Sequence, residues 1–398
     1  MSKTSEFLNR ISESETLAAA RIARELKQSG KDVIALNIGE PDFNTPDFIK
    51  DAAKKAIDDN YSKYPPVNGY LELRETISKK FKRDNKLDYH PDNILVSTGA
   101  KHSLVNAILA VVEKGDEVIL FTPYWVSYRA MVELAGAKVV EAAAGVDQDY
   151  KVTPSILENA ISDKTKMLIF SSPCNPTGSV YSEKELRAIA KVLEKHPNIL
   201  VISDEIYEHI NFVGQHFSIG QCSEIADRVI TVNGVSKSFA MTGYRIGYMG
   251  GPTWVIKAAT KLQGQFTSGA NGIAQIAAKA ALEAPASSVH YMRDDFEKRK
   301  SLVLEKLNEI PGLKVNNPDG AFYVFPEVKE LFGKKTKDGQ VIANAGDFCQ
   351  ALLEDQYVSV VSGSAFGAPN CFRISYATAE SDLIKALDRM KAFVLSLD

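Results

Sequence analysis

The chain has 398 residues, of which 45% are hydrophobic and 24% charged, a composition that is ordinary for a globular protein. Its 47 basic and 50 acidic side chains give a net charge of −3, which predicts no broad basic surface for nucleic acid or an anionic membrane. No apolar run reaches about 18 residues, so we expect no membrane-spanning helix. The length suits two domains better than one.

Two features of the sequence predict a cytoplasmic protein. The first residues contain an acidic side chain and no apolar core, so they fit neither a signal peptide nor a transit peptide. The cysteines form no Cys-x-x-Cys pair and no metal-ligand spacing, which is typical of reduced thiols and predicts no metal site. They are Cys174, Cys222, Cys349 and Cys371.

Seven short apolar runs alternate with helical patterns between about residues 90 and 250. Several of these runs are β-branched and continuous, which is typical of strands buried on both faces of a mainly parallel sheet. Residues 184–195 show the helical pattern, with apolar side chains at spacings of three and four. We therefore predict an α/β domain with a mostly parallel seven-stranded sheet flanked by helices. The runs are residues 94–98, 117–122, 138–142, 166–171, 199–204, 228–233 and 244–249.

A second region, residues 286–398, follows the predicted sheet. It opens with a long helix that Pro311 and Gly312 end. Three predicted strands alternate with helices after it, so we expect a smaller α+β domain beside a large domain over residues 46–285. The long helix covers residues 289–309, and the strands cover residues 320–325, 358–361 and 372–376.

Ligands of open α/β sheets bind beyond the carboxyl ends of the strands, so residues at those ends are candidates for a site. Gly99, Ala100 and Lys101 follow the first run and open a helix, where free backbone N–H groups can bind a phosphate. The alternative for these residues is a plain tight turn. Trp125 follows the second run, and its indole either stacks on a flat ring or serves as a core or interface aromatic.

Two further strand ends carry polar residues. Asn175 precedes Pro176, which keeps Asn175 out of the helical region and can aim its amide at a ligand, although such sequences also form simple turns. We predict a cis bond between these two residues. Asp204 ends a buried run, where an unpaired carboxylate is costly and a protonated ring nitrogen would offset that cost. Capping of the next helix is the alternative role of Asp204.

Lys237 gives the most specific signal, in the run of residues 234–247 behind the predicted strand 228–233. A lysine among small, partly apolar neighbours can lose its proton and attack a carbonyl as a free amine. Arg245 follows eight residues later, and its planar fork of donors matches phosphate oxygens. An aldehyde and a phosphate on one cofactor indicate pyridoxal 5′-phosphate (PLP). A lone Ser-Lys near an arginine is also typical of a solvated loop.

Arg373 lies inside the apolar run 372–376, where its charge needs an anionic partner. A bidentate clamp on the α-carboxylate of an amino acid would supply one. A structural salt bridge is the alternative.

The run around Lys237 resembles the lysine-attachment signature of class I aminotransferases, the fold type I PLP enzymes. The resemblance extends over nearly the whole chain, and it is strongest to the bacterial aspartate aminotransferase subgroup. It implies that Lys237 carries the cofactor and that Trp125 stacks on the cofactor ring. It further implies that Gly99, Ala100 and Lys101 form the phosphate cup.

The resemblance also implies roles around the cofactor ring. Asp204 pairs with the ring nitrogen, and Tyr207 donates to the phenolic oxygen. Asn175 binds the same oxygen and approaches the substrate carboxylate. Ser236 and Arg245 bind the phosphate.

Substrate and subunit contacts follow from the same resemblance. Arg373 docks the α-carboxylate, Gly39 belongs to a mobile substrate loop, and Lys101 reaches a side-chain carboxylate. Tyr64 crosses a dimer interface to the partner's phosphate, which implies a homodimer with shared active sites. Residues 1–45 pack with the small domain. The other residues expected to contact substrate are Trp125, Asn175 and Thr16.

Two positions depart from the family pattern. Many members carry a serine three residues before the lysine, where this chain has Gly234, so the other phosphate ligands must carry more of the binding. Subgroup members that also use prephenate carry a lysine where this chain has Ser12, which argues against prephenate as a substrate.

The sequence thus predicts ping-pong amino transfer from L-aspartate to 2-oxoglutarate, with Lys237 moving the proton. Its partners would be small amino acids and 2-oxo acids. The alternatives are an aromatic, alanine or kynurenine aminotransferase or a β-lyase on the same scaffold, and a non-enzymatic PLP-sensing regulator. The chain begins almost directly with the aminotransferase pattern and has no basic extension, which argues against the regulator.

Overall fold

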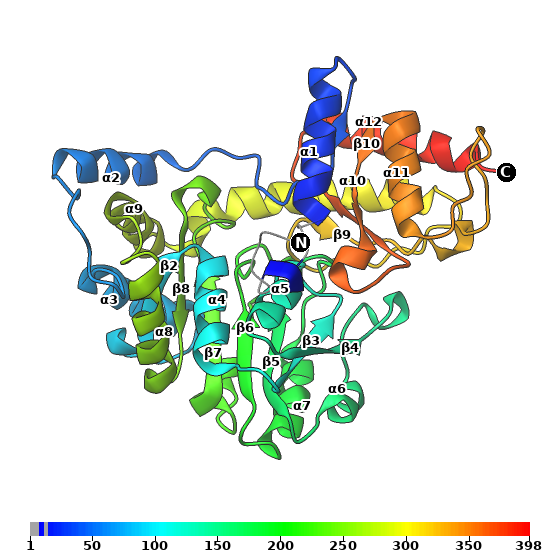
Figure 1. Ribbon diagram of the computed structural model, residues 1–398. Helices are drawn as coiled ribbons and strands as arrows, with labels where there is room; N and C mark the ends of the chain where they lie inside the picture. Colours follow the sequence, from blue (N-terminus) through cyan, green and yellow to red (C-terminus); the bar gives the residue numbers. More distant parts are fainter. Residues whose placement is uncertain (1–7, 12–14) are drawn as a thin grey trace.

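The computed structural model describes residues 8–11 and 15–398. A layered body surrounds one large sheet, and a smaller lobe built from both ends of the chain lies above it on one side (Figure 1). The strands of the large sheet are β2 (Ile94–Thr98), β3 (Glu117–Thr122), β4 (Lys138–Ala143), β5 (Thr165–Ser171), β6 (Leu200–Asp204), β7 (Val229–Gly234) and β8 (Ile246–Gly250).

The large sheet confirms the predicted α/β class. Its seven strands lie in the order β2-β8-β7-β6-β5-β3-β4. The pairs β3–β4, β3–β5, β5–β6 and β6–β7 are parallel, whereas β8 is antiparallel to both of its neighbours. The carboxyl ends of the six other strands therefore meet at one edge of the sheet.

Alternate residues of the central strands pack into two separate cores, which explains the continuous apolar runs. Val118 and Leu120 of β3 face one core, and Ile119 and Phe121 face the other. The first core lies under α4 (Ala100–Val111), α5 (Ser127–Leu134) and α8 (Thr253–Phe266). The second lies under α6 (Pro154–Ala160) and α7 (Glu183–Glu194).

Three helices extend the body beyond strand β2. They are α2 (Asp47–Asp58), α3 (Leu71–Lys80) and α9 (Gly272–Glu283). α9 packs against both α2 and α3. α3 runs directly into a single π turn, η2 (Phe81–Asn85).

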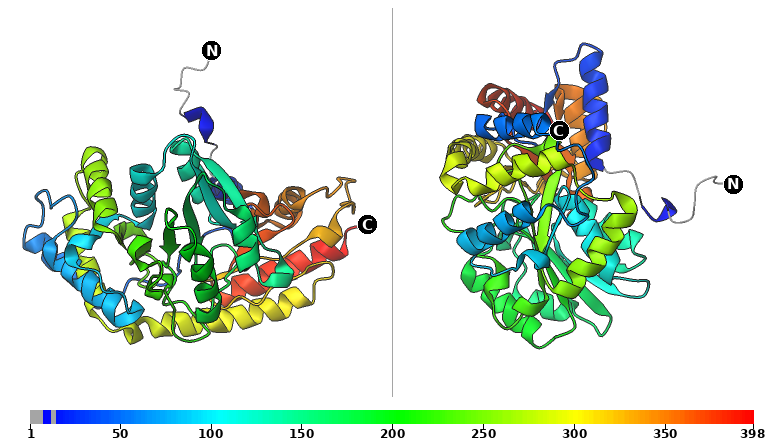
Figure 2. Two further views of the ribbon diagram at one scale, coloured as in Figure 1. Left: turned by 90° about the horizontal axis from the view of Figure 1, so that it is seen from below. Right: turned by 90° about the vertical axis from the view of Figure 1, so that its left-hand side faces the viewer.

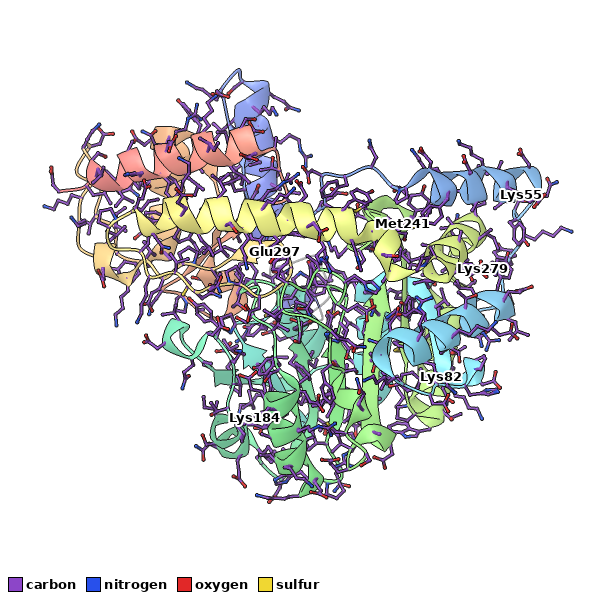
Figure 3. All side chains as sticks on the ribbon, turned by 180° about the vertical axis from the view of Figure 1, so that it is seen from behind. Lys55, Lys82, Lys184, Met241, Lys279 and Glu297 are labelled. Carbon is purple, nitrogen blue, oxygen red and sulfur yellow. The ribbon has the colours of Figure 1, made fainter. Side chains whose placement is uncertain are left out.

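The smaller lobe contains short strands and three C-terminal helices. The long helix α10 crosses the back of the molecule below α12, with the exposed Glu297 on it (Figure 3). It lies alongside α12 in the other views as well (Figure 2). The helices are α10 (His290–Asn308), α11 (Ala345–Gln356) and α12 (Glu380–Leu395). The strands are β9 (Tyr323–Val324), β10 (Val358–Ser359), β11 (Val361–Ser362) and β12 (Phe372–Ser375).

The N-terminal segment joins this lobe through a strand pair. α1 (Glu15–Gln28) leads to β1 (Ile34–Ala35), and β1 pairs in parallel with β10. β11, β12 and β9 form a separate antiparallel sheet. Among the described residues no helix is long and apolar enough to cross a membrane.

The structure differs from the sequence-based boundaries by one residue at several ends and by more than that at three places. The predicted strand 320–325 is only the two-residue β9 (Tyr323–Val324). The predicted strand 358–361 is two strands, because β10 pairs with β1 whereas β11 pairs with β12. β8 begins at Ile246 instead of residue 244, because Thr242–Tyr244 form a 3-10 turn and Arg245 has a φ of +57°.

We predict that Gly247→Ala destabilises the sheet where β8 passes the start of α4. A methyl group on Gly247 would lie 2.1 Å from the backbone nitrogen of Ala100 and 2.4 Å from the backbone carbonyl carbon of Gly99. The strand must shift to admit it, so the free energy of unfolding should fall by about 1–3 kcal/mol in urea titrations. Gly243→Ala is the control, because a methyl group there meets no atom within 4 Å. Equal stability of the two variants would contradict this prediction.

Candidate active site

A cavity of about 360 Å³ opens at the carboxyl edge of the large sheet. The structure brings most of the predicted site residues to it, from segments that are far apart in the chain. The predicted residues that line it are Gly39, Ala100, Lys101, Trp125, Asn175, Asp204, Tyr207, Ser236, Lys237, Arg245 and Arg373.

Lys237 enters the cavity from the turn that follows β7. Its Nζ donates a hydrogen bond to the carbonyl oxygen of Gly39 at 2.6 Å. Burial lowers the pKa of Lys237 to about 8, although the nearby carboxylate of Glu40 opposes the change. A minor but appreciable fraction of its amine is therefore neutral near physiological pH, far more than for an ordinary lysine, as a nucleophile or general base requires.

Asp204 lies at the end of β6 and is only 4% exposed. The Tyr128 hydroxyl donates to its Oδ2 at 2.6 Å, and the backbone N–H of Ile206 donates to its Oδ1 at 3.3 Å. Burial raises the pKa of Asp204 to about 6, although these two hydrogen bonds lower it. A cation next to this carboxylate would favour its ionised form.

Tyr207 and Tyr323 are in contact at the boundary between the large-sheet body and the smaller lobe. Their hydroxyl groups are 2.8 Å apart, and their rings meet edge to face with centroids 5.8 Å apart. Tyr207 follows β6 and Tyr323 belongs to β9, so this contact joins the large sheet to the smaller lobe.

Arg373 of β12 is a buried cation at the cavity wall, 2% exposed. Its Nη1 donates to Asn175 Oδ1 at 3.0 Å, and its Nη2 donates to the carbonyl oxygen of Asn37 at 2.7 Å. Its Nε is buried and has no hydrogen-bond partner in the structure. Burial lowers the pKa of Arg373, and among the described residues no carboxylate forms a salt bridge with it. An anionic ligand would supply the missing charge.

The loop that carries Asn175 has the predicted backbone. The peptide bond between Asn175 and Pro176 is cis, which confirms that prediction. The bonds before Pro123 and Pro173 are also cis, which the sequence analysis did not anticipate.

The start of α4 and Arg245 form one end of the cavity. Gly99 has a φ of +83°, and a methyl group on it would lie 2.4 Å from Arg245 Nη2. The guanidinium thus lies directly against the glycine turn, where Nη1 donates to the carbonyl oxygen of Thr242 at 2.9 Å. The buried Ser236 lines the cavity as well. Backbone N–H groups, a hydroxyl and a guanidinium together suit a phosphate.

Lys101 and Trp125 form a second cationic wall. The Lys101 Nζ lies 4.9 Å from the centre of the Trp125 ring, and the Trp125 ring meets Tyr128 edge to face at 5.5 Å. Burial lowers the pKa of Lys101, and the nearby Arg245 lowers it further. A carboxylate bound here would relieve both effects.

The segment of residues 37–45 closes one side of the cavity and is held at several points. Lys237 binds the carbonyl oxygen of Gly39, and the Thr242 hydroxyl donates to Glu40. Further along, the Thr45 hydroxyl donates to the carbonyl oxygen of Ala240 at 2.6 Å. Asp42 forms a two-fold ion pair with Arg299 of α10, at 2.8 and 2.9 Å.

Among the predicted residues that the structure describes, two do not line the cavity. Tyr64 is 93% exposed and has no described contact with it. Gly99 does not line the cavity, but it lies against the guanidinium of Arg245, which does. The side chain of Thr16 lies outside the described part of the structure, as does the whole of Ser12.

Other residues line the cavity that the sequence analysis did not identify. Tyr128 had a usable signal, since it lies one helical turn after the strand-end Trp125 and thus near the same ligand. Tyr323 had none, because its role depends on a contact with a residue 116 positions away. The unpredicted lining residues are Ile38, Glu40, Leu104, Tyr128, Ser171, Ile206, Thr242 and Tyr323.

Comparison with known proteins agrees with this geometry. The model of the family "aminotransferase class I and II" matches residues 31–390. The chain therefore belongs to this family, and the protein is an aminotransferase.

Relatives of the chain match it over its full length. It is 46% identical to the aspartate/prephenate aminotransferase of Cereibacter sphaeroides, with 100% of both chains covered. It is 44% identical to the aspartate aminotransferase of Bacillus subtilis, with 98% of this chain and 99% of that protein covered.

Solved structures of aspartate aminotransferases have the same fold. The enzyme of Rhizobium meliloti is 42% identical, with a TM-score of 0.97 and 100% of both chains covered. The Thermus thermophilus enzyme with maleate is 40% identical, with a TM-score of 0.92 and 99% of this chain and 100% of that chain covered.

We predict that the amine of Lys237 reacts with a pH midpoint near 8 in the cofactor-free protein, because only the neutral amine is nucleophilic. Reductive methylation at a series of pH values, read by peptide mass spectrometry, measures this midpoint. Lys54 is the internal reference, because its hydrogen bond to Asp51 raises its pKa above the ordinary 10.5. A common midpoint for both lysines would show that burial does not activate Lys237.

Proposed function

We propose that this aminotransferase uses PLP to transfer the amino group of L-aspartate to 2-oxoglutarate in a ping-pong cycle. The observation that carries the proposal is one cavity that joins an amine, a buried carboxylate and a buried guanidinium. These are Lys237, Asp204 and Arg373.

The residues of the cavity fit PLP at each of its functional groups. The phosphate matches the turn of residues 99–101 with Ser236 and Arg245, where a methyl group on Gly99 would fill the space of the guanidinium. A protonated ring nitrogen matches the Asp204 carboxylate, which needs a cation because burial has raised its pKa. Lys237 is the amine for the aldehyde, and when bound, PLP supplies an electron-withdrawing ring beside the substrate.

The remaining residues hold the ring and the substrate in this proposal. Trp125 stacks on the ring face, and Tyr207 and Asn175 donate hydrogen bonds to the phenolic oxygen. Arg373 binds the substrate α-carboxylate with its paired donors. Lys237 then removes the proton from the substrate α-carbon and later returns a proton, as its lowered pKa permits.

Specificity for a dicarboxylic substrate is supported by the cationic wall of the cavity. Lys101 is partly desolvated against Trp125, so a side-chain carboxylate of the substrate would be bound favourably there. Thr16 is the second proposed ligand for that carboxylate. The names of the relatives support aspartate as the amino donor, and the first of them adds prephenate as a candidate to be tested.

We also propose a homodimer with shared active sites and a division of the chain into three parts. Tyr64 is too exposed to serve the cavity of its own chain, which supports a role in the partner's phosphate site. Residues 1–45 would pack with the small domain, as the β1–β10 pair and the contacts of α1 with β11 suggest. Residues 46–285 would form the PLP-binding domain and residues 286–398 the small domain.

We predict that the purified protein shows a visible absorbance band from covalently bound PLP, and that L-aspartate removes this band. Lys237→Ala should lack the band and lose turnover by about 10²- to 10⁴-fold, because the acid–base group is gone. Lys184→Ala, on the exposed face of α7, is the control and should keep both.

Borohydride reduction followed by peptide mass spectrometry locates the cofactor. A pyridoxyl group on any lysine other than Lys237, or on none, would refute the proposed chemistry. A panel of amino donors with 2-oxoglutarate decides the substrate. Faster turnover of alanine, kynurenine or an aromatic amino acid than of aspartate would refute the dicarboxylate proposal while leaving PLP in place. Prephenate, itself a 2-oxo acid, is tested as the amino acceptor with aspartate as the donor.

We predict that Tyr64→Phe weakens PLP binding by about tenfold or more, as expected for loss of a hydrogen bond to a charged group. Titration of the cofactor-free protein with PLP measures this affinity, and sedimentation measures the mass of the active species. Tyr61→Phe is the control, since Tyr61 packs edge to face on Tyr70 of its own chain. Full activity of a dilute monomer would remove the shared-site proposal.

A further inference from the structure

A second polar cluster lies next to Asp204 and Tyr207 but outside the cavity. Glu205 and Glu208 alternate with these two residues in the chain and do not line the cavity. Their side chains are 0% and 3% exposed. Together with Lys80 and Asn85 of the first 90 residues they form what we call the buried ionic network, composed of Lys80, Asn85, Glu205 and Glu208.

Both oxygens of the Glu205 carboxylate accept hydrogen bonds from other groups of the protein. Its Oε1 accepts hydrogen bonds from Ser203 Oγ at 2.9 Å and from Ser218 Oγ at 2.6 Å. Its Oε2 accepts one from Asn85 Nδ2 at 3.0 Å, and His216 Nε2 lies 3.0 Å from the same oxygen. These contacts fix both oxygens of a side chain whose backbone directly follows Asp204.

The carboxylate of Glu208 shares one of these donors, Asn85, and is also bound by Lys80. Lys80 Nζ donates to its Oε1, and Asn85 Nδ2 donates to its Oε2 at 2.6 Å. Burial alone would raise the pKa of Glu208, but Lys80 beside it brings the value down to about 2. Glu205, Glu208 and His216 offer ligand atoms within 4.8 Å of one another, as in metal sites, yet here the Lys80 ammonium supplies the positive charge.

A local feature of the backbone places Lys80 and Asn85 together. They are five residues apart, so in a regular α-helix they would point in different directions. The π turn η2 instead closes with a hydrogen bond from the Lys86 N–H to the Phe81 carbonyl, five residues back. Lys80 Nζ then donates to Asn85 Oδ1 at 2.7 Å, and both side chains face the two glutamates. π turns of this kind are frequent at functional sites.

Stability alone does not explain such a network. Removing ions from water costs free energy that their mutual attraction rarely exceeds, so apolar residues of similar volume are often equally or more stabilising. What a buried pair adds is geometry, since each charge accepts few positions. Here the network holds the side chains of residues 205 and 208 in place. Residues 204 and 207 of the same short segment line the cavity.

We propose that Lys80 and Asn85 are positioning residues for the active site. By binding Glu205 and Glu208 they fix the segment of residues 204–208, and so set where the Asp204 carboxylate and the Tyr207 hydroxyl meet the cofactor ring. This inference rests on the proposed function, because it assigns the ring as the group that the two side chains address.

The test separates positioning from stability with a charge-free replacement of the pair. Lys80→Met and Glu208→Leu each leave a buried charge without its partner, so each single variant should unfold at lower urea concentration. The double variant removes both charges, and its unfolding midpoint should return close to that of the unchanged protein. Its kcat should nevertheless stay about tenfold to 100-fold lower, with KM changed by less than about threefold.

A spectroscopic readout accompanies the kinetics. The pH midpoint of the visible band of bound PLP should differ by about one unit in the double variant, because Asp204 no longer meets the ring nitrogen in the same position. The matched control is Lys195→Met with Glu158→Leu, which removes a pair that is 62% and 52% exposed. This control should leave kcat and the band midpoint unchanged.

Asn85→Leu gives an independent variant that leaves no unpaired charge, in case the double variant does not fold. It should lower kcat and shift the band midpoint in the same direction. If a folded double variant or a folded Asn85→Leu variant has the kcat and the band midpoint of the unchanged protein, the network is only structural and the inference is overturned. Absence of the band from the unchanged protein would instead refute the proposed function, so the two failures are distinguishable.

Discussion

Burial of charge within one cavity is the constraint on which the rest of this structure depends. Desolvation disfavours the charged forms of Lys237 and Asp204 and shifts their pKa values toward each other, to about 8 and about 6. Arg373 experiences the same effect and has no carboxylate partner among the described residues. A ligand that brings both anionic and cationic groups therefore gains free energy at several points of the cavity at once.

The parallel sheet supplies the place where these charges meet. Because six strands share one direction, turns that are far apart in sequence end at the same edge. Among the described strands of this sheet, β8 alone runs in the opposite direction, and it brings Arg245 to this edge against the glycine turn at Gly99. The smaller lobe completes the wall with Arg373 and Tyr323, so side chains from both lobes line the cavity.

The sequence was sufficient to predict the large sheet and most of the cavity. Strands buried on both faces leave continuous β-branched runs, and polar residues directly after such runs are conspicuous. Contacts between distant segments left no comparable trace. The bond between Tyr207 and Tyr323 joins residues 116 positions apart, and the pairing of Lys80 with Asn85 needs a π turn that no residue pattern announces. Strand ends in the smaller lobe were also misplaced, because one run divides between two partners.

The hydrogen bond between Lys237 Nζ and the carbonyl oxygen of Gly39 couples reaction at the amine to the mobility of the backbone of residues 37–45. A nitrogen that forms a covalent bond loses donor capacity. Reaction at Lys237 therefore weakens one hydrogen bond that holds the segment of residues 37–45. A carboxylate that engages Arg373 likewise competes with its bond to Asn37. Occupancy of the cavity would thus loosen this stretch at two of its attachments, both on the cavity side, while its bonds to Thr242, Ala240 and Arg299 stay intact and limit how far it can move.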